Sequence, residues 1–160
     1  MMIALGLILI LAATVFTGLL AGISLDKAIV QLPARHHMGV IEFAAFSRAN
    51  DLGNGLIVYP VLGIGAALLA WAAALVVALQ GIPLPHVWQV YFSAFLALLH
   101  SITTARAAPT LMRLRQLDIN EATLIKTFDH FAKWHNIRAA LQLLNFIVLV
   151  WALVEYILIT

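Results

Sequence analysis

The chain has 160 residues, of which 64% are hydrophobic and only 10% are charged, and its mean hydropathy is +1.03. A soluble domain of this size cannot bury so much apolar surface, so a soluble fold is excluded. The composition predicts an all-α polytopic membrane protein, a single domain over residues 1–160 with four transmembrane helices in a bundle. The chain has no Cys, which excludes disulfides, thiolate nucleophiles and Cys-ligated metals.

The first predicted span covers residues 3–24, since no charged side chain precedes Asp26. A spanning helix needs about 20 apolar residues to cross about 30 Å of hydrocarbon, and this stretch is long enough. It has no Lys or Arg ahead of its apolar run and no small-residue cleavage site. We therefore expect it to be kept as a span and not removed as a signal peptide.

Small residues mark one face of this first span. Gly18 and Gly22 are four residues apart, and Thr14 extends the same face by one turn. Small residues let a neighbouring helix backbone approach closely, which favours helix association in lipid. We expect this face to pack within the bundle, with a homo-oligomer or a larger membrane complex docking through Gly18 and Gly22 as the alternative. Gly63 and Gly65 are expected to act similarly in the second span.

The middle of the chain predicts two further spans. The stretch from Leu52 to Ala105 contains no Lys, Arg, Asp or Glu and is too long for a single crossing. We expect spans over residues 55–79 and 87–107. The break falls at residues 80–86, where two prolines and a glycine end one helix and allow a tight reversal.

The last part of the chain predicts an amphipathic helix followed by the fourth span. Asp118 or Asn120 is expected to cap this helix, which covers about residues 120–135. We expect it to lie along the membrane interface before the chain turns into a span over residues 137–158. Its apolar stripe consists of residues at spacings of four and three: Leu124, Phe128 and Phe131.

The cations define the topology. All nine Lys and Arg residues fall within residues 26–51 or 106–138. With four spans, the first and third connections, which carry these cations, lie on one side of the membrane. Both termini and the short connection at residues 80–86 lie on the other side. The positive-inside rule then predicts a protein of the bacterial inner (plasma) membrane with both termini outside the cytoplasm. The excess positive charge suits anionic lipid headgroups, so the lipid bilayer is the expected partner and nucleic acid is not.

Polar residues gather where the last two spans meet the cytoplasmic side. On the fourth helix they share one face, and the third span adds His100 and Arg106 at similar depth. One interpretation is structural, with amides bridging helices and arginines reaching the headgroups. The other is a pocket at the cytoplasmic end, apolar in its walls, for a lipophilic aromatic small molecule. The residues on the fourth helix are His135, Arg138, Gln142 and Asn145.

The six histidines do not form a recognisable metal motif. No pair has the spacing of four that places two imidazoles together on a helix. A site that joins His36 or His37 to His130 or His135 across the two connections is an open alternative, as is a haem between His100 and His135. We expect no metal and no cofactor.

Four segments occur in order along the chain: Gly18-Leu-Leu-Ala-Gly22, Phe43-Ala-Ala-Phe46-Ser-Arg48, Ala108-Pro109 and Trp134-His135-Asn136-Ile137-Arg138. Together they resemble the anthrone oxygenase-like family of small four-helix membrane proteins, most of unknown function. The resemblance implies a four-helix bundle and, for members linked to polyketide pathways, cofactor-independent oxygenation of an activated aromatic ring. The chain departs from the family at the end of the third helix, which reads Thr104-Ala-Arg106-Ala-Ala-Pro109.

The predicted function is therefore the binding or oxygenation of a lipophilic aromatic compound. His135 or His100 would act as the base, and Arg138 would stabilise a phenolate. The alternative is a non-catalytic accessory or structural subunit of a membrane complex. The resemblance makes Trp134, Asn136 and Arg138 the motif positions, with Arg48 a softer match. The expected ligand-binding residues are Trp134, Asn136, Gln142, Asn145, Arg48 and Arg106.

Overall fold

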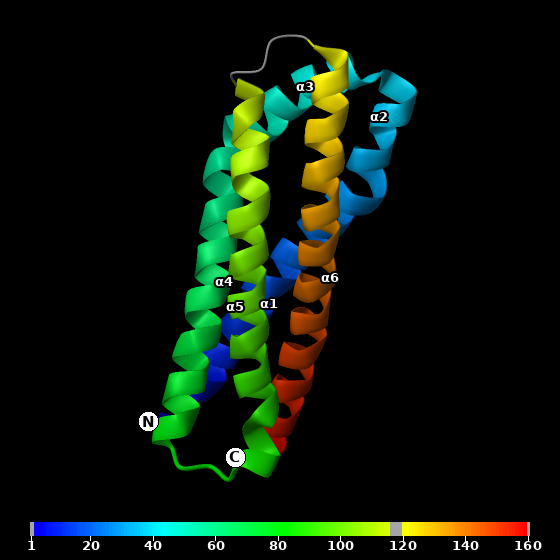
Figure 1. Cartoon of the computed structure of the whole chain (residues 1–160). Coiled ribbons are helices and arrows are strands. Elements are labelled where there is room, and N and C mark those ends of the chain that lie inside the picture. Colours follow the sequence, from blue (N-terminus) through cyan, green and yellow to red (C-terminus); the bar gives the residue numbers. More distant parts are fainter. Residues whose placement is uncertain (1, 116–119, 160) are drawn as a thin grey trace.

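The computed structural model describes residues 2–115 and 120–159. Within these ranges the chain is helical almost throughout and contains no strand. Four helices are long and apolar enough to cross a membrane, and they lie side by side as a bundle (Figure 1). The all-α fold is confirmed, and the protein is an integral membrane protein. The four helices are α1 (Met2–Asp26), α4 (Gly55–Leu79), α5 (Leu84–Met112) and α6 (Glu121–Ile159).

The helices form a ring in which α1 packs against α4 and α6, and α5 packs against α6. The ring closes where α4 meets α5, and this contact is less extensive than the other three. Both termini lie near the α4–α5 connection, at what we call the terminal end (Figure 1). The opposite end carries the Lys and Arg residues and is called the basic end.

The α4–α5 connection is the predicted reversal. Helix α4 ends at Leu79 and α5 begins at Leu84, with Pro85 in its first turn. Proline suits this position because its missing N–H has no helical acceptor there. Gly81 has a φ of +67°, a conformation that residues with a side chain rarely adopt. The reversal therefore lies at residues 80–83, inside the expected stretch 80–86, and residues 84–86 already belong to α5.

The first connection folds back over the basic end instead of forming a loose loop. Two short helices meet at Gly39, which has a φ of +88° and turns the chain between them. Wide π-helical turns join this pair to the flanking long helices. In chain order the elements are η1 (Lys27–Gln31), α2 (Leu32–Met38), α3 (Val40–Ala49) and η2 (Asn50–Asn54), and a 3₁₀ turn, η3 (Arg113–Arg115), follows α5.

Helix α6 differs from the prediction. The amphipathic stretch expected at residues 120–135 continues into the fourth span as one helix of 39 residues, so a separate interfacial helix that turns into the span is wrong. The physical reason is that neither Pro nor Gly occurs between Glu121 and Ile159 to break the hydrogen-bond ladder. Asn120 caps the helix, accepting a hydrogen bond at Oδ1 from the Thr123 backbone N–H at 3.2 Å. Asp118 lies outside the described residues.

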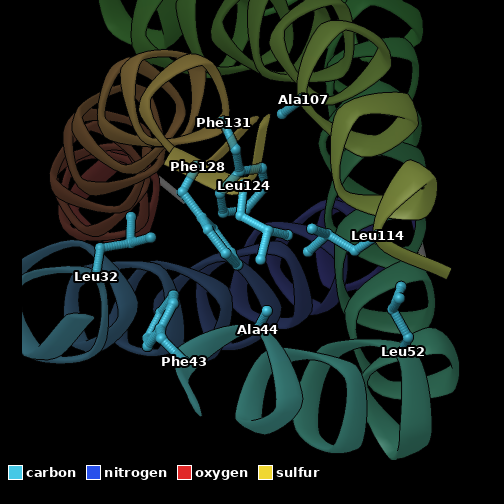
Figure 2. Packing of buried hydrophobic residues seen from close by; sticks show 9 residues of the cluster. All are labelled: Leu32, Phe43, Ala44, Leu52, Ala107, Leu114, Leu124, Phe128 and Phe131. Atoms are coloured by element: carbon cyan, nitrogen blue, oxygen red, sulfur yellow. The ribbon is translucent and has the colours of Figure 1, made fainter. Parts of the chain in front are cut away.

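The apolar stripe of α6 is covered by protein. Phe128 meets the ring of Phe43 edge-on, with centroids 4.9 Å apart, and the surrounding side chains come from α2, α3, η2, α5 and η3 (Figure 2). Arg35 and Asp129 form an ion pair at 2.8 Å at the edge of this cluster. We call the cluster and the elements that form it the cap. Its buried residues are Leu32, Phe43, Ala44, Leu52, Ala107, Leu114, Leu124, Phe128 and Phe131.

The terminal end is closed by close packing and by one polar side-chain pair. Tyr156 Oη donates to Gln80 Oε1 at 2.7 Å, and Gln80 Nε2 donates to the backbone carbonyl of Met2 at 2.6 Å. Gly6 allows this approach, since a Cβ there would lie 2.3 Å from the Tyr156 hydroxyl. Helices α1 and α6 and the α4–α5 connection are thereby joined at one point.

The glycines of α1 are used differently from one another. A Cβ on Gly18 would lie 2.8 Å from the Phe146 ring of α6, so Gly18 packs within the bundle as expected. A Cβ on Gly22 would have no atom within 4 Å. Gly65 packs against Phe16, whereas Gly63 lies near His100. Gly18 and Gly22 therefore do not share one contact surface, and docking of another chain stays a prediction for Gly22 alone.

Candidate functional site

A cavity of about 560 Å³ lies inside the bundle toward the basic end, with walls from α1, α4, α5 and α6. Its deeper part, toward the terminal end, is apolar and is bounded by Ala67, Leu68 and Trp71. Its upper part carries most of the charged and hydrogen-bonding side chains. The polar lining residues are Ser24, Lys27, Asp51, Tyr59, His100, Ser101, Thr104, His135, Arg138 and Gln142.

The cavity opens sideways between α4 and α5. Ile64 and Leu68 line it, yet they are 61% and 56% exposed, so this part of the wall faces outward. The α4–α5 contact is less extensive than the other helix contacts, which leaves room for an opening. Trp71 closes its deep end by donating from Nε1 to the Ala94 carbonyl at 3.1 Å. This side of the cavity is therefore bounded by side chains that face away from the bundle.

Arg138 and His135 form a fixed pair at the polar end. One guanidinium nitrogen of Arg138, Nη2, lies 2.6 Å from His135 Nδ1, and His135 Nε2 lies 3.0 Å from the Ser24 carbonyl. Because guanidinium only donates and a carbonyl only accepts, Nδ1 is the acceptor and Nε2 carries the hydrogen. Phe131 stacks on the imidazole at 5.4 Å. Both ring nitrogens are engaged, so His135 orients Arg138 from behind.

His100 and Gln142 form a second pair deeper in the bundle. Gln142 Nε2 lies 2.8 Å from His100 Nδ1, and both side chains are buried. The other ring nitrogen, Nε2, points toward the cavity, where it would lie 3.7 Å from a Cβ on Gly63. Gln142 Oε1 has no partner within the described part of the chain. Turning the amide would offer this oxygen to Nδ1–H and leave Nε2 as a free acceptor.

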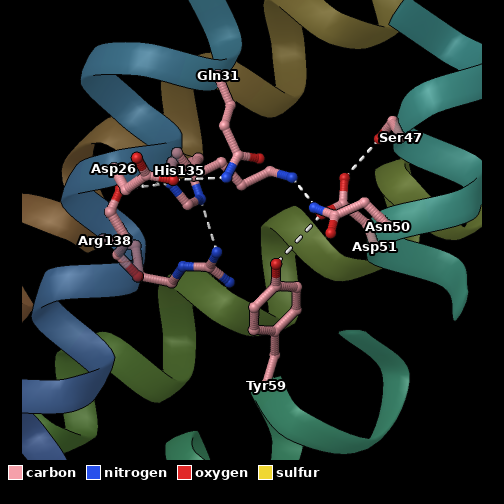
Figure 3. A network of polar contacts seen from close by, with 10 residues as sticks. Asp26, Gln31, Ser47, Asn50, Asp51, Tyr59, His135 and Arg138 are labelled. Atoms are coloured by element: carbon pink, nitrogen blue, oxygen red, sulfur yellow. Dashed lines mark hydrogen bonds and ion pairs between the residues drawn. The ribbon is translucent and has the colours of Figure 1, made fainter. Parts of the chain in front are cut away.

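Lys27 and Asp51 form a buried ion pair that joins η1 to η2 at the top of the cavity. Asp51 also accepts a hydrogen bond from Ser47 Oγ, and the Tyr59 hydroxyl lies 3.5 Å from Asp51 Oδ1 (Figure 3). The Lys27 Nζ lies 5.7 Å from the centroid of the Phe131 ring. Sequence reasoning missed Lys27, whose only visible signal was a charge at the end of a span.

Arg138 has no carboxylate partner among the described residues. The ion pairs within 4.0 Å in this part of the chain are Lys27–Asp51 and Arg35–Asp129. The Arg138 Nε is also buried without a hydrogen-bond acceptor in the same residues. A partly buried cation that has no ion-pair partner within 4.0 Å is less stable there than in water, because the low-dielectric interior solvates its charge poorly. The polar end of the cavity is therefore suited to an oxygen that carries negative charge.

The structure brings together His100, His135, Arg138 and Gln142 of the predicted site residues, and it places the others away from the cavity. Trp134 packs against the cap, and Asn136 and Arg106 are exposed. Arg48 Nε donates to the Leu114 carbonyl at 2.8 Å and so joins α3 to η3. Asn145 is 5% exposed, but it does not line the cavity.

The chemistry on offer is thus a fixed cation, an imidazole and an apolar space that opens to lipid. Among the described residues, no group of three or more His, Asp or Glu side chains is placed to hold a metal ion. The polar contacts around the cavity are donors and acceptors suited to an organic ligand. No protein-family model, no curated protein and no solved structure matches this chain, and the cavity's own residues therefore carry the functional inference.

Proposed function

We propose that this protein binds a lipophilic aromatic compound of the phenol or hydroxyanthrone class in the cavity, with an oxygen of the ligand beside Arg138. The observation that carries the proposal is Arg138 at the polar end of an apolar space, partly buried with its Nε enclosed, and without an ion-pair partner among the described residues. A phenolate oxygen would accept a charge-assisted hydrogen bond and offset the cost of the partly buried cation.

The size and walls of the cavity suit such a ligand. Ligand pockets usually enclose about 300–1,000 Å³, and this one measures about 560 Å³. The apolar part between Ala67 and Trp71 would hold the rings, and the ligand would enter between α4 and α5 from the lipid. In this proposal the basic end faces the cytoplasm of a bacterial inner membrane, and both termini lie outside.

We extend the proposal to oxygenation, which the anthrone oxygenase-like resemblance implies by analogy. With the Gln142 amide turned so that its Oε1 accepts from Nδ1–H, His100 Nε2 would take a proton from the ring CH₂ of an anthrone, and Arg138 would stabilise the negative charge on the ketone oxygen. The carbanion would then reduce O₂ to a hydroperoxide on that carbon. Loss of water from the hydroperoxide gives the anthraquinone, so one O₂ is consumed and one water is formed.

Ligand binding tests the first part. Titration of the purified protein with a hydroxyanthraquinone, followed by its visible absorption, is expected to show binding that weakens about 10- to 100-fold in Arg138→Ala, the loss expected for a hydrogen bond to a charged group. Arg106→Ala removes an exposed arginine and is expected to bind as wild type. Unchanged binding in a folded Arg138→Ala protein, together with a stoichiometric protein partner on purification, would favour the accessory-subunit alternative.

Oxygen uptake tests the second part. With an anthrone as substrate, the affinity of His100→Ala for the ligand is expected to stay within about threefold of wild type, because Arg138 and not His100 contacts the charged oxygen. The variant is expected to consume O₂ at the uncatalysed rate. A base typically contributes about 10²–10⁴-fold to such a step. Equal O₂ uptake by His100→Ala and wild type would remove the catalytic role and leave a binding protein.

A further inference from the structure

A second hollow lies on the outer face of the bundle, between α1 and α4. It is a groove of about 470 Å³ at the level where these spans meet the basic end. Gln31 Nε2 donates to Asp26 Oδ2 at 2.6 Å on one side of it. Polar side chains form a larger share of this lining than of the cavity lining, so we expect water in the groove, in contrast to the opening between α4 and α5. The polar lining residues are Asp26, Gln31, Asn50, Asn54 and Tyr59.

The groove and the cavity share a wall. Three residues line both spaces: Ile23, Gly55 and Tyr59. Gly55 leaves room for the Tyr59 ring, since a Cβ there would lie 2.7 Å from Tyr59 Cε2. The hydroxyl of Tyr59 is turned toward Asp51 at the cavity side (Figure 3). Of the three residues that line both spaces, Tyr59 alone therefore has a side chain with a polar group, and its ring separates the groove from the cavity.

We propose that Tyr59 is the barrier between a lipid-facing cavity and a water-facing groove, and that it limits which molecules reach Arg138 from the groove. Lipophilic ligands enter between α4 and α5, whereas water, protons and other small polar species pass by Tyr59. The barrier stands on geometry alone. The use of this route, to remove the ligand's proton and the water formed, rests on the function proposed above.

The absence of Cys from the chain makes the barrier directly measurable. Ser24→Cys places a thiol on the cavity wall with little change in size, at a residue that is 4% exposed. In lipid nanodiscs we expect a charged methanethiosulfonate reagent to label this thiol at least tenfold faster in a Tyr59→Ala background than with Tyr59 present. Tyr59→Phe keeps the ring and is expected to label slowly.

A second substitution separates an open barrier from a damaged fold. Gly22 lines the groove, and a Cβ there meets no atom within 4 Å, so Gly22→Phe should fill the groove without a clash. In the Tyr59→Ala background it is expected to return the labelling of Ser24→Cys to the slow rate, because the reagent must pass through the groove. An unfolded protein would label fast with or without the added phenylalanine.

Equal labelling rates with and without the Tyr59 ring would overturn the proposal, as would fast labelling in the filled groove. Asn54→Cys reports on the groove itself and is expected to label fast with or without Tyr59. The labelling needs no ligand, so its outcome is independent of whether a hydroxyanthraquinone binds at Arg138. A protein that binds no aromatic ligand but shows gated labelling would keep the barrier and lose the proposed function.

Discussion

The two ends of the bundle are built from different materials. At the terminal end, small and branched apolar side chains pack tightly, and Tyr156 and Gln80 join α1, α6 and the α4–α5 connection at one point. At the basic end, the long helices separate around a cavity lined by charged and hydrogen-bonding groups, and the separate cap covers it. A sealed end that keeps the helices together allows the other end to remain hollow without losing the bundle.

Within the basic end, the two cations that line the cavity also differ in their partners. Lys27 and Asp51 are buried and paired, whereas Arg138 is held by a neutral imidazole. Pairing removes the electrostatic cost of Lys27 and leaves that of Arg138 for a ligand to relieve. Lys27 and Arg138 thus line the same cavity, and of these two cations only Lys27 forms an ion pair with a carboxylate among the described residues.

The largest effect is expected from Lys27→Ala, which leaves Asp51 buried and unpaired. Breaking a buried ion pair typically costs about 3–5 kcal/mol, so unfolding in detergent should begin at clearly lower denaturant or temperature. The double variant Lys27→Met/Asp51→Leu removes both charges and is expected to recover most of that loss. If the single variant is as stable as wild type, the pair does not hold the connection over the cavity.

A smaller effect separates the closed end from the open one. Gly6→Ala places a Cβ 2.3 Å from the Tyr156 hydroxyl and is expected to cost about 1–3 kcal/mol, the usual range for overpacking. Gly22→Ala is the matched change at the open groove and should leave stability within about 0.5 kcal/mol, as for most surface substitutions. Similar losses from both variants in parallel thermal melts would argue against the contrast in packing.

Tyr156→Phe sharpens the same comparison by removing only a hydroxyl. The loss of its hydrogen bonds to Gln80 and to the Ile3 carbonyl is expected to cost about 1 kcal/mol. Binding of a hydroxyanthraquinone at the other end should be unchanged. Weakened binding in this variant would show that the two ends are not independent.

The smallest effect is expected at the start of α6. Asn120→Ala removes the cap of the Thr123 N–H and should cost about 0.5–1 kcal/mol, at the low end for such caps because the site is exposed. Hydrogen exchange is expected to rise in the first turn of α6 and not in the spans. Faster hydrogen exchange near Tyr156 would mean that the first turn of α6 and the terminal end unfold together.

The four spans were predictable because crossing lipid imposes a length and an apolar composition that a single sequence displays. The break at residues 80–86 was predictable for a similar reason, since Pro and Gly act locally. Lys27 and Asp51 were not paired in advance, because contact between residues 24 positions apart leaves no periodic signal. The face shared by His135, Arg138 and Gln142 followed from helical spacing, whereas the tautomer of His135 depends on Ser24, which only the packing of α1 against α6 reveals.

One feature of α6 places the protein in two solvents. At about 1.5 Å per residue its 39 residues extend about 58 Å, nearly twice the hydrocarbon thickness of a bilayer. The Phe43–Phe128 cluster is then a small water-driven core, while Gly18 and Phe146 pack where lipid gives apolar groups no reason to gather. Urea and low temperature weaken the hydrophobic effect. They should therefore loosen the packing of the cap over the cavity while the transmembrane helices remain assembled.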